Sequence, residues 1–109
     1  MVTMHGLYFL RDPGTEAQFK DAYHAFGGHL VDEGYITTWR LMRRLPHEQY
    51  DSRPPTQPYY CALDFPSVKL AQACHDYVEA NQDPLRTLHR AVNQLVVRPT
   101  TQFYLTEDY

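Results

Sequence analysis

The chain has 109 residues, of which 43% are apolar and 14% are aromatic, and its net charge is −3. This length and composition predict one folded domain over residues 1–109 rather than a disordered segment. The charge shows no excess of basic residues, which argues against a nucleic-acid-binding protein. No segment approaches the roughly 18 apolar residues of a membrane span, and the start lacks the apolar run of a signal peptide. We therefore expect a cytoplasmic protein with no membrane association.

The two cysteines and six histidines form no recognisable disulfide or metal motif. Cys61 and Cys74 lack C-x-x-C spacing, and two buried thiols are typical of a reducing compartment. No H-x-x-x-H, H-E-x-x-H or Gly-rich phosphate motif is present, so we predict no locally built metal site and no cofactor. A metal site assembled across strands or between subunits stays open.

The first third of the chain predicts a strand and then a long helix. Residues 4–11 are rich in strand-forming side chains and end at a turn-forming sequence. Thr15 and Gln18 have the spacing of a capping box, which predicts a helix start just after Thr15. The apolar residues of this helix recur on one side: Phe19, Ala22, Tyr23, Phe26 and Leu30. Gly27-Gly28 should weaken or bend it, by about 1 kcal/mol per glycine.

The middle of the chain predicts two strands joined by a long connection. Residues 35–45 and residues 59–65 are both rich in β-forming side chains. Residues 46–58 contain four prolines and no periodicity. A connection of this length is uncommon in a compact domain. Its role stays open: the connection could close over a pocket, hold a partner subunit or be disordered.

The last third predicts two helices and a final strand. Ser67 is a helix N-cap, and Asp83 with Pro84 forms an N-cap and N1 pair that starts a second, short helix. The apolar stripe of the first is Leu70, Ala71, Cys74, Tyr77 and Val78, and that of the second is Leu85, Leu88, Val92 and Leu95. Pro99 ends the second helix, and residues 101–106 predict the last strand.

The resulting order, βαββαβ, predicts the ferredoxin-like α+β fold, with a four-stranded antiparallel sheet and the helices on one face. A sheet with one face in water alternates apolar and polar residues. These strands do not: His5 and Leu7 share one face of the first strand, and Met4 and Tyr8 share the other. Because the helices cover only one face, we expect a second copy of the chain to cover the other, giving a homodimeric α/β barrel.

With this layout the chain resembles the dimeric α/β-barrel superfamily, and the likeness covers nearly all 109 residues. The segments MHGLYFLR and TEAQFKDAYHAF are similar to the stress-responsive A/B-barrel branch and to polyketide cyclases, and the whole resembles an uncharacterised bacterial branch. In those proteins a strand histidine and a helix tyrosine line a pocket between sheet and helices, which implies that role for His5 and Tyr23. Tyr77, within CHDYV, resembles a second pocket tyrosine. Asp83-Pro84 stands where those enzymes carry a catalytic His-Pro segment.

Five residues are candidates for a ligand site. We predict His5, Tyr23 and Tyr77 as catalytic, with the imidazole as a base on the strand face toward the helices and the phenols as hydroxyl donors. Trp39 and Arg40 are predicted to bind the ligand, because arginine can hold a carboxylate or phosphate by two bonds. The alternative for each is structural: a core histidine, core aromatic side chains, or an arginine that bridges to the partner or meets water.

One face of the last helix carries Arg86, His89, Arg90 and Asn93. This face could meet an anion, but a solvated face is the prediction.

Two functional hypotheses follow. The first is a small-molecule-binding protein, with a cofactor-independent acid–base enzyme of isomerase, cyclase or monooxygenase type as its catalytic form. The alternative is a non-catalytic structural or partner-binding homodimer, so whether the protein is an enzyme stays open. A haem role, with His75 or His89 as a lone axial ligand, ranks third. The first hypothesis requires a cavity in which His5 and a tyrosine hydroxyl reach one ligand atom.

Overall fold

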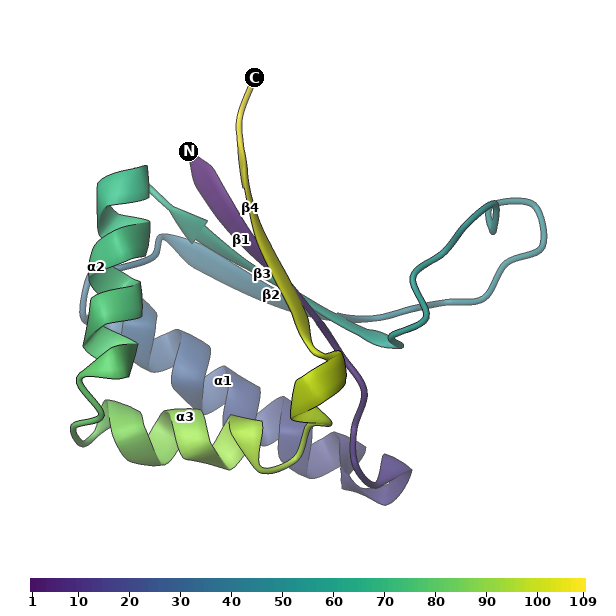
Figure 1. Cartoon of the computed structure of the whole chain (residues 1–109), viewed down its shortest axis with the longest axis horizontal. Helices are drawn as coiled ribbons and strands as arrows, with labels where there is room; N and C mark the ends of the chain where they lie inside the picture. Colours follow the sequence, from purple (N-terminus) through teal and green to yellow (C-terminus); the bar gives the residue numbers. More distant parts are fainter.

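The computed structural model describes all of residues 1–109 as one sheet with helices on a single side (Figure 1). The antiparallel strands β1 (Val2–Tyr8), β2 (Thr38–Arg43), β3 (Tyr59–Phe65) and β4 (Gln102–Glu107) lie in the order β2-β3-β1-β4. The helices are α1 (Glu16–Asp32), α2 (Val68–Glu79) and α3 (Leu85–Asn93), with 3₁₀ turns η1 (Pro13–Thr15) and η2 (Arg98–Thr100). The predicted ferredoxin-like α+β fold is confirmed. No helix is long and apolar enough to span a membrane.

The helix starts follow local sequence in part. Helix α3 begins at Leu85 with Pro84 as its N-cap, so the predicted N-cap and N1 pair of Asp83 and Pro84 lies one residue too early. Asp83 Oδ1 still accepts a hydrogen bond from the N–H of Thr87 at 3.1 Å.

Ser67 caps α2 as predicted, because its Oγ accepts a hydrogen bond from the backbone N–H of Leu70 at 3.2 Å. Thr15 makes no capping side-chain bond, contrary to the capping-box prediction. The turn before α1 is held instead by Asp12, whose Oδ1 accepts from the N–H of Gly14 at 2.8 Å.

Helix α1 is continuous from Glu16 to Asp32 and runs through Gly27-Gly28, the pair predicted to weaken or bend it. Gly27 is buried, and its missing side chain leaves room for the indole of Trp39 on β2. Tertiary contact therefore outweighs the low helix propensity of the two glycines.

The hydrophobic core lies between the sheet and the helices. Its strand residues include Tyr8, Cys61, Leu63 and Phe65, and its α1 residues are Phe19, Tyr23, Phe26 and Leu30. Helices α1 and α3 pack against each other, and α2 lies at one end of the sheet (Figure 1). The edge strand β4 has no buried residue, because no helix packs closely on it.

Strand register decides which face each side chain takes. In β1, Gly6 lies opposite both Cys61 of β3 and Phe103 of β4. Tyr8 is buried in the core beside Cys61, so the even-numbered residues of β1 face the helices. His5 therefore points to the opposite face of the sheet, contrary to the prediction that it looks at the helices. Because side chains alternate along a strand, placing Tyr8 in the core forces His5 out of it.

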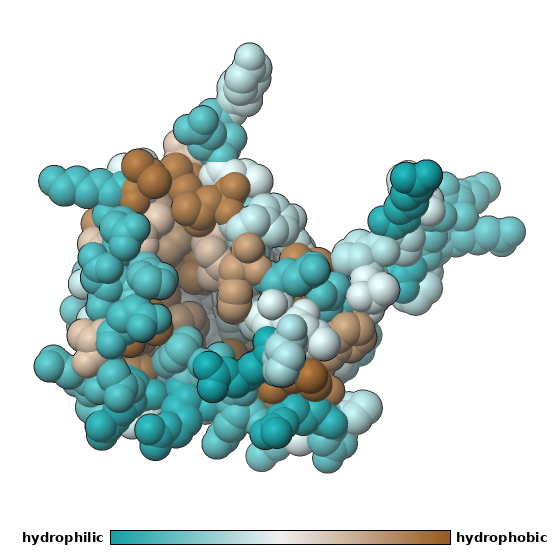
Figure 2. All heavy atoms as spheres, viewed as in Figure 1, coloured by the Kyte–Doolittle hydropathy of each residue, from teal (hydrophilic) through white to brown (hydrophobic).

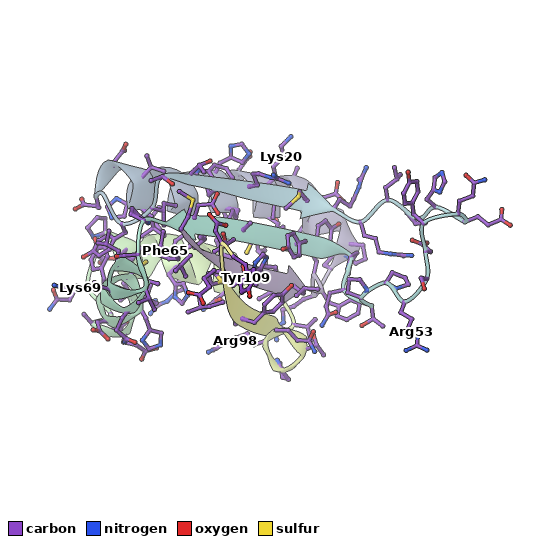
Figure 3. All side chains as sticks on the ribbon, turned by 90° about the horizontal axis from the view of Figure 1, so that it is seen from above. Lys20, Arg53, Phe65, Lys69, Arg98 and Tyr109 are labelled. Carbon is purple, nitrogen blue, oxygen red and sulfur yellow. The ribbon has the colours of Figure 1, made fainter.

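The face of the sheet away from the helices is uncovered (Figure 3). We call it the open face; its side chains include Thr3, His5, Tyr60, Ala62, Tyr104 and Thr106. The connection between β2 and β3 projects beyond the end of this sheet, away from α2 and α3 (Figures 1 and 3). Asp51 organises it by accepting hydrogen bonds from Arg44 Nη2 at 2.5 Å and from the N–H of His47 at 3.1 Å.

Candidate ligand-binding site

A cavity of about 690 Å³ lies between the sheet and the helices, on the side of edge strand β4. Fourteen of its 21 lining residues are hydrophobic, so its character is mainly apolar. Figure 2 shows the hollow between apolar side chains near the sheet and hydrophilic side chains on the helices. Phe103 and Leu105 of β4 face it and remain 58% and 52% exposed. The cavity therefore exists because β4 extends the sheet past the helices that cover the other strands.

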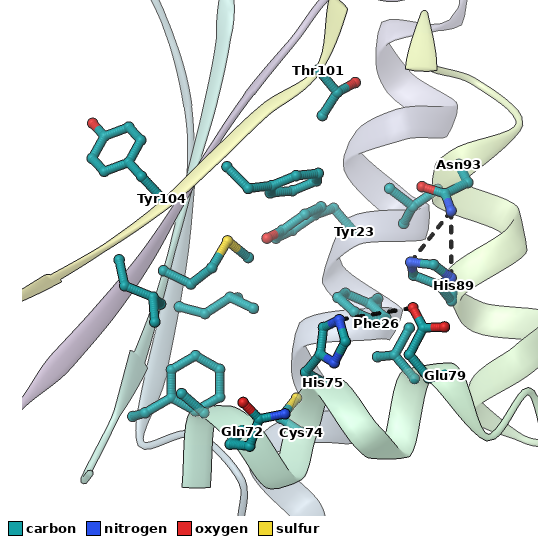
Figure 4. A pocket seen from close by; sticks show the side chains of 18 of the residues that line it. Tyr23, Phe26, Gln72, Cys74, His75, Glu79, His89, Asn93, Thr101 and Tyr104 are labelled. Atoms are coloured by element: carbon teal, nitrogen blue, oxygen red, sulfur yellow. Dashed lines mark hydrogen bonds and ion pairs between the residues drawn. The ribbon is translucent and has the colours of Figure 1, made fainter. Parts of the chain in front are cut away.

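The phenol of Tyr23 is the buried polar group of this cavity. Tyr23 belongs to the apolar stripe of α1 and is only 1% exposed. Its hydroxyl is buried without a hydrogen-bond partner, although unpaired buried polar groups are rare. Burial, followed by the nearby Cys61 thiol, raises the pKa of Tyr23 well above its ordinary value. The hydroxyl therefore stays protonated. It points toward the sheet side of the cavity (Figure 4), with the Cys61 thiol, a weak acceptor, nearby.

A histidine and an amide from α3 form a second polar element in the wall. The amide nitrogen of Asn93 lies 3.3 Å from Nε2 and 3.4 Å from Nδ1 of His89 (Figure 4). The ring of Phe26 packs on the imidazole with centroids 5.8 Å apart, and on the Tyr23 ring at 6.0 Å. Burial, followed by the charge of Arg98, lowers the pKa of His89. The neutral imidazole that results at neutral pH is the form that accepts a proton.

Helix α2 supplies more solvated groups to the cavity. His75 Nε2 lies 3.8 Å from a Glu79 carboxylate oxygen, and both side chains are mostly exposed. Cys74, which also lines the cavity, is buried, and burial raises the pKa of its thiol to about 11. No group of three or more histidine, cysteine, aspartate or glutamate side chains is placed to hold a metal ion.

Of the three predicted catalytic residues, only Tyr23 lines the cavity. His5 lies on the open face, where its ring hydrogen-bonds the hydroxyls of Tyr60 and Thr106 and stacks on Tyr104 at 4.7 Å. Tyr77 points elsewhere from α2: its hydroxyl bonds His29 Nε2 at 2.9 Å. The predicted convergence of His5, Tyr23 and Tyr77 on one ligand atom is therefore not observed.

The two predicted ligand-binding residues also lie outside the cavity. The indole of Trp39 is half-buried and packs against Gly27 and the ring of Tyr23, so it supports the cavity wall from behind. Arg40 is exposed on the open face, with Nη2 3.1 Å from the sulfur of Met42.

Sequence reasoning missed His89 and Asn93, which were assigned to a solvated helix face. Both are half-buried and line the cavity. The available signal was spacing: His89 follows Leu85 by four residues, and Asn93 follows His89 by four, so both border the apolar stripe of α3.

Fold and site together define a ferredoxin-like α+β protein with an apolar cavity between sheet and helices. A model of a family of unknown function, DUF6614, matches residues 1–106, and the chain belongs to this family. No curated protein matches it at a significant level.

Solved structures similar to this chain share its fold at low sequence identity. An Arabidopsis thaliana protein is 6% identical, with a TM-score of 0.73 over 100% of this chain and 96% of that one. A dimeric ferredoxin-like protein of unknown function from Jannaschia sp. CCS1 is 14% identical, with a TM-score of 0.69 over 98% of both chains. An antibiotic biosynthesis monooxygenase is 10% identical, with a TM-score of 0.63 over 100% of this chain and 99% of that one. The likeness concerns the fold, which hosts many chemistries.

Proposed function

We propose that this protein binds a small apolar ring compound in the cavity between its sheet and helices. The unpartnered, buried hydroxyl of Tyr23 carries the proposal. A buried donor without an acceptor costs free energy unless a ligand supplies the acceptor. A volume of about 690 Å³ lies within the range of small-molecule sites, which are mainly apolar with few polar groups. A carbonyl or ether oxygen on an otherwise apolar ligand would satisfy Tyr23.

Binding is tested by titrating 2-naphthamide, an uncharged bicyclic amide, into the protein and following backbone amide signals by NMR. We expect shifts that cluster at residues lining the cavity, such as Phe26, Val78 and Val92. Val78→Phe should abolish these shifts by filling the cavity. Val31→Phe, at an exposed site on α1, is the matched control and should leave binding intact. Shifts that persist unchanged in Val78→Phe would place the ligand elsewhere and refute the proposal.

Proton transfer is the second candidate function, because Tyr23 and His89 both line the cavity and pack on the ring of Phe26. The neutral imidazole would take a proton from the carbon next to a ligand carbonyl, and the bonding pair would move to the oxygen as an enolate. The Tyr23 hydroxyl would donate a hydrogen bond to that oxygen. Deuterium exchange into 2-tetralone in D₂O measures this step. His89→Gln should remove the exchange and His75→Gln should not; equal rates in the two variants would exclude His89 as the base.

We also propose that the open face packs against the same face of a second copy. Sequence reasoning expected this partner, and the similar protein from Jannaschia is described as dimeric. Ala62 lies in the middle of the open face, between Arg40 of β2 and His5 of β1. Ala62→Glu would bury a charge in such an interface, whereas Gln18→Glu adds the same charge to an exposed site on α1. We expect light scattering to report a dimer for Gln18→Glu and a monomer for Ala62→Glu; a monomeric parent protein would contradict the proposal.

A further inference from the structure

A second, smaller hollow of about 480 Å³ adjoins the large cavity at its α3 end. Its lining includes three arginines, Arg11, Arg90 and Arg98, together with Asn93 and Gln94. Asn93 and Arg98 also line the large cavity, so the two hollows share part of one wall. An apolar space thus opens beside a basic one.

Backbone hydrogen bonds bring the arginines together from three separate segments. Arg11 follows β1, Arg90 lies in the last turn of α3, and Arg98 begins η2. The N–H of Arg11 donates to the carbonyl of Leu95 at 2.9 Å, and the N–H of Val97 donates to the carbonyl of Phe9 at 2.9 Å. These bonds join the end of β1 to the segment between α3 and β4. The backbone positions of Arg11 and Arg98 are therefore held close together beside the end of α3.

None of these three arginines pairs with a carboxylate. Arg43, Arg44 and Arg86 do make such ion pairs elsewhere on the protein. No acidic residue lines the smaller hollow. The carboxylate next in sequence, Asp12, is engaged with the N–H of Gly14. Across the large cavity, Glu79 lies beside His75. Positive charge in the smaller hollow therefore has no neutralising partner within the chain, although the net charge of the chain is −3.

We propose that the ligand of this protein is an amphipathic oxyanion, with an apolar ring in the large cavity and a carboxylate or phosphate group among Arg11, Arg90 and Arg98. This inference rests on the proposed function and adds the chemical class of the ligand. Guanidinium groups bind such oxyanions through paired, charge-assisted hydrogen bonds. A free inorganic anion would leave the apolar cavity empty, and a neutral ring would leave the arginines unpaired. One molecule with both parts matches both hollows.

The test compares 2-naphthoate, 2-naphthyl phosphate and uncharged 2-naphthamide by calorimetric titration at low salt. We expect one or both anions to bind at least about tenfold more tightly than the amide, the ratio that one charge-assisted hydrogen bond supports. The tighter anion distinguishes a carboxylate from a phosphate ligand. Arg98→Gln should reduce the affinity for the anions and leave the affinity for the amide unchanged. Arg90→Gln provides a second variant at another exposed position of the hollow.

Arg53→Gln is the matched control, because Arg53 is exposed, unpaired and far from the cavity on the projecting connection (Figure 3). It removes the same charge and should leave all three affinities unchanged. Equal affinities for anions and amide, or equal losses in Arg53→Gln and Arg98→Gln, would overturn the inference and leave the cavity proposal intact. Failure of every compound to bind would refute the cavity proposal and this inference with it.

Discussion

The indole of Trp39 packs directly on the backbone of Gly27, so a Cβ atom at Gly27 would lie 2.6 Å from the indole carbon Cδ2. This contact joins β2 to the middle of α1 and places Trp39 behind Tyr23. A Cβ atom at the adjacent Gly28 would have no neighbouring atom within 4 Å. Two neighbouring glycines in one helix therefore have different roles, the first steric and the second without a packing requirement.

Gly27→Ala and Gly28→Ala should change stability in opposite directions. Gly27→Ala is expected to lower the free energy of unfolding by about 2 kcal/mol, because the rigid indole must move. Gly28→Ala should raise it by up to about 1 kcal/mol through better helix propensity. Urea unfolding followed by circular dichroism measures both. Equal effects of the two substitutions would show that the indole is not fixed against Gly27.

Tyr23→Phe should stabilise the unliganded protein. The hydroxyl is buried without a partner, so its removal relieves a desolvation cost of about 1 kcal/mol. The same change should weaken binding of 2-naphthamide, because the ligand loses its donor. Thermal unfolding of the parent and the variant, with and without ligand, measures both effects. A variant less stable than the parent without ligand would show that the hydroxyl already has a structural partner.

His89 should make stability fall on acidification. Its pKa is lowered in the folded state by burial and by Arg98, with Glu79 acting in the opposite direction. When the pH is above the ordinary histidine pKa of 6.5, the imidazole is neutral in both the folded and the unfolded state, and its burial does not lower the free energy of unfolding. Stability is lost as the pH falls below that value, because the unfolded chain then binds the proton more tightly.

The measurement is urea unfolding between pH 7.5 and pH 5, at intervals of about half a unit, a range chosen to span the histidine pKa. His89→Gln should flatten the dependence, whereas His75→Gln, at a mostly exposed site, should retain it. An identical slope in the parent and in His89→Gln would exclude His89 as its source.

The thiol of Cys74 should be unreactive in the native state. Burial raises its pKa to about 11, so little thiolate is present at pH 8. Cys61 is fully buried beside Tyr8, with its pKa also raised by burial. Reaction with 5,5′-dithiobis(2-nitrobenzoate) at pH 8 should be slow in buffer and complete in denaturant. Rapid labelling of one thiol in buffer would contradict this prediction and show that the thiol is accessible to the reagent in the native state.

Sequence periodicity predicted the elements of the fold because each element buries a local pattern. The stripe of α1 and the capping position of Ser67 depend on neighbours within one or two turns, and both are observed. Tyr23 lies on that stripe, which places it in the core, whereas its role in a pocket was implied by the resemblance to the dimeric α/β-barrel superfamily. The arrangement of βαββαβ elements then left few alternatives to a ferredoxin-like sheet.

The face of His5 and the membership of the cavity were decided by tertiary structure. Strand β1 is apolar on both sides, so its sequence does not say which side meets the helices. Only the register, in which Gly6 lies opposite Cys61 and Phe103, placed Tyr8 inward. Likewise, the end of α3 separates His89 from Arg98 in the sequence. Backbone hydrogen bonds between the segment after α3 and the end of β1 place both residues at one cavity. Local patterns determine elements because they act over a few residues, whereas a site made by distant segments is fixed only when the chain has folded.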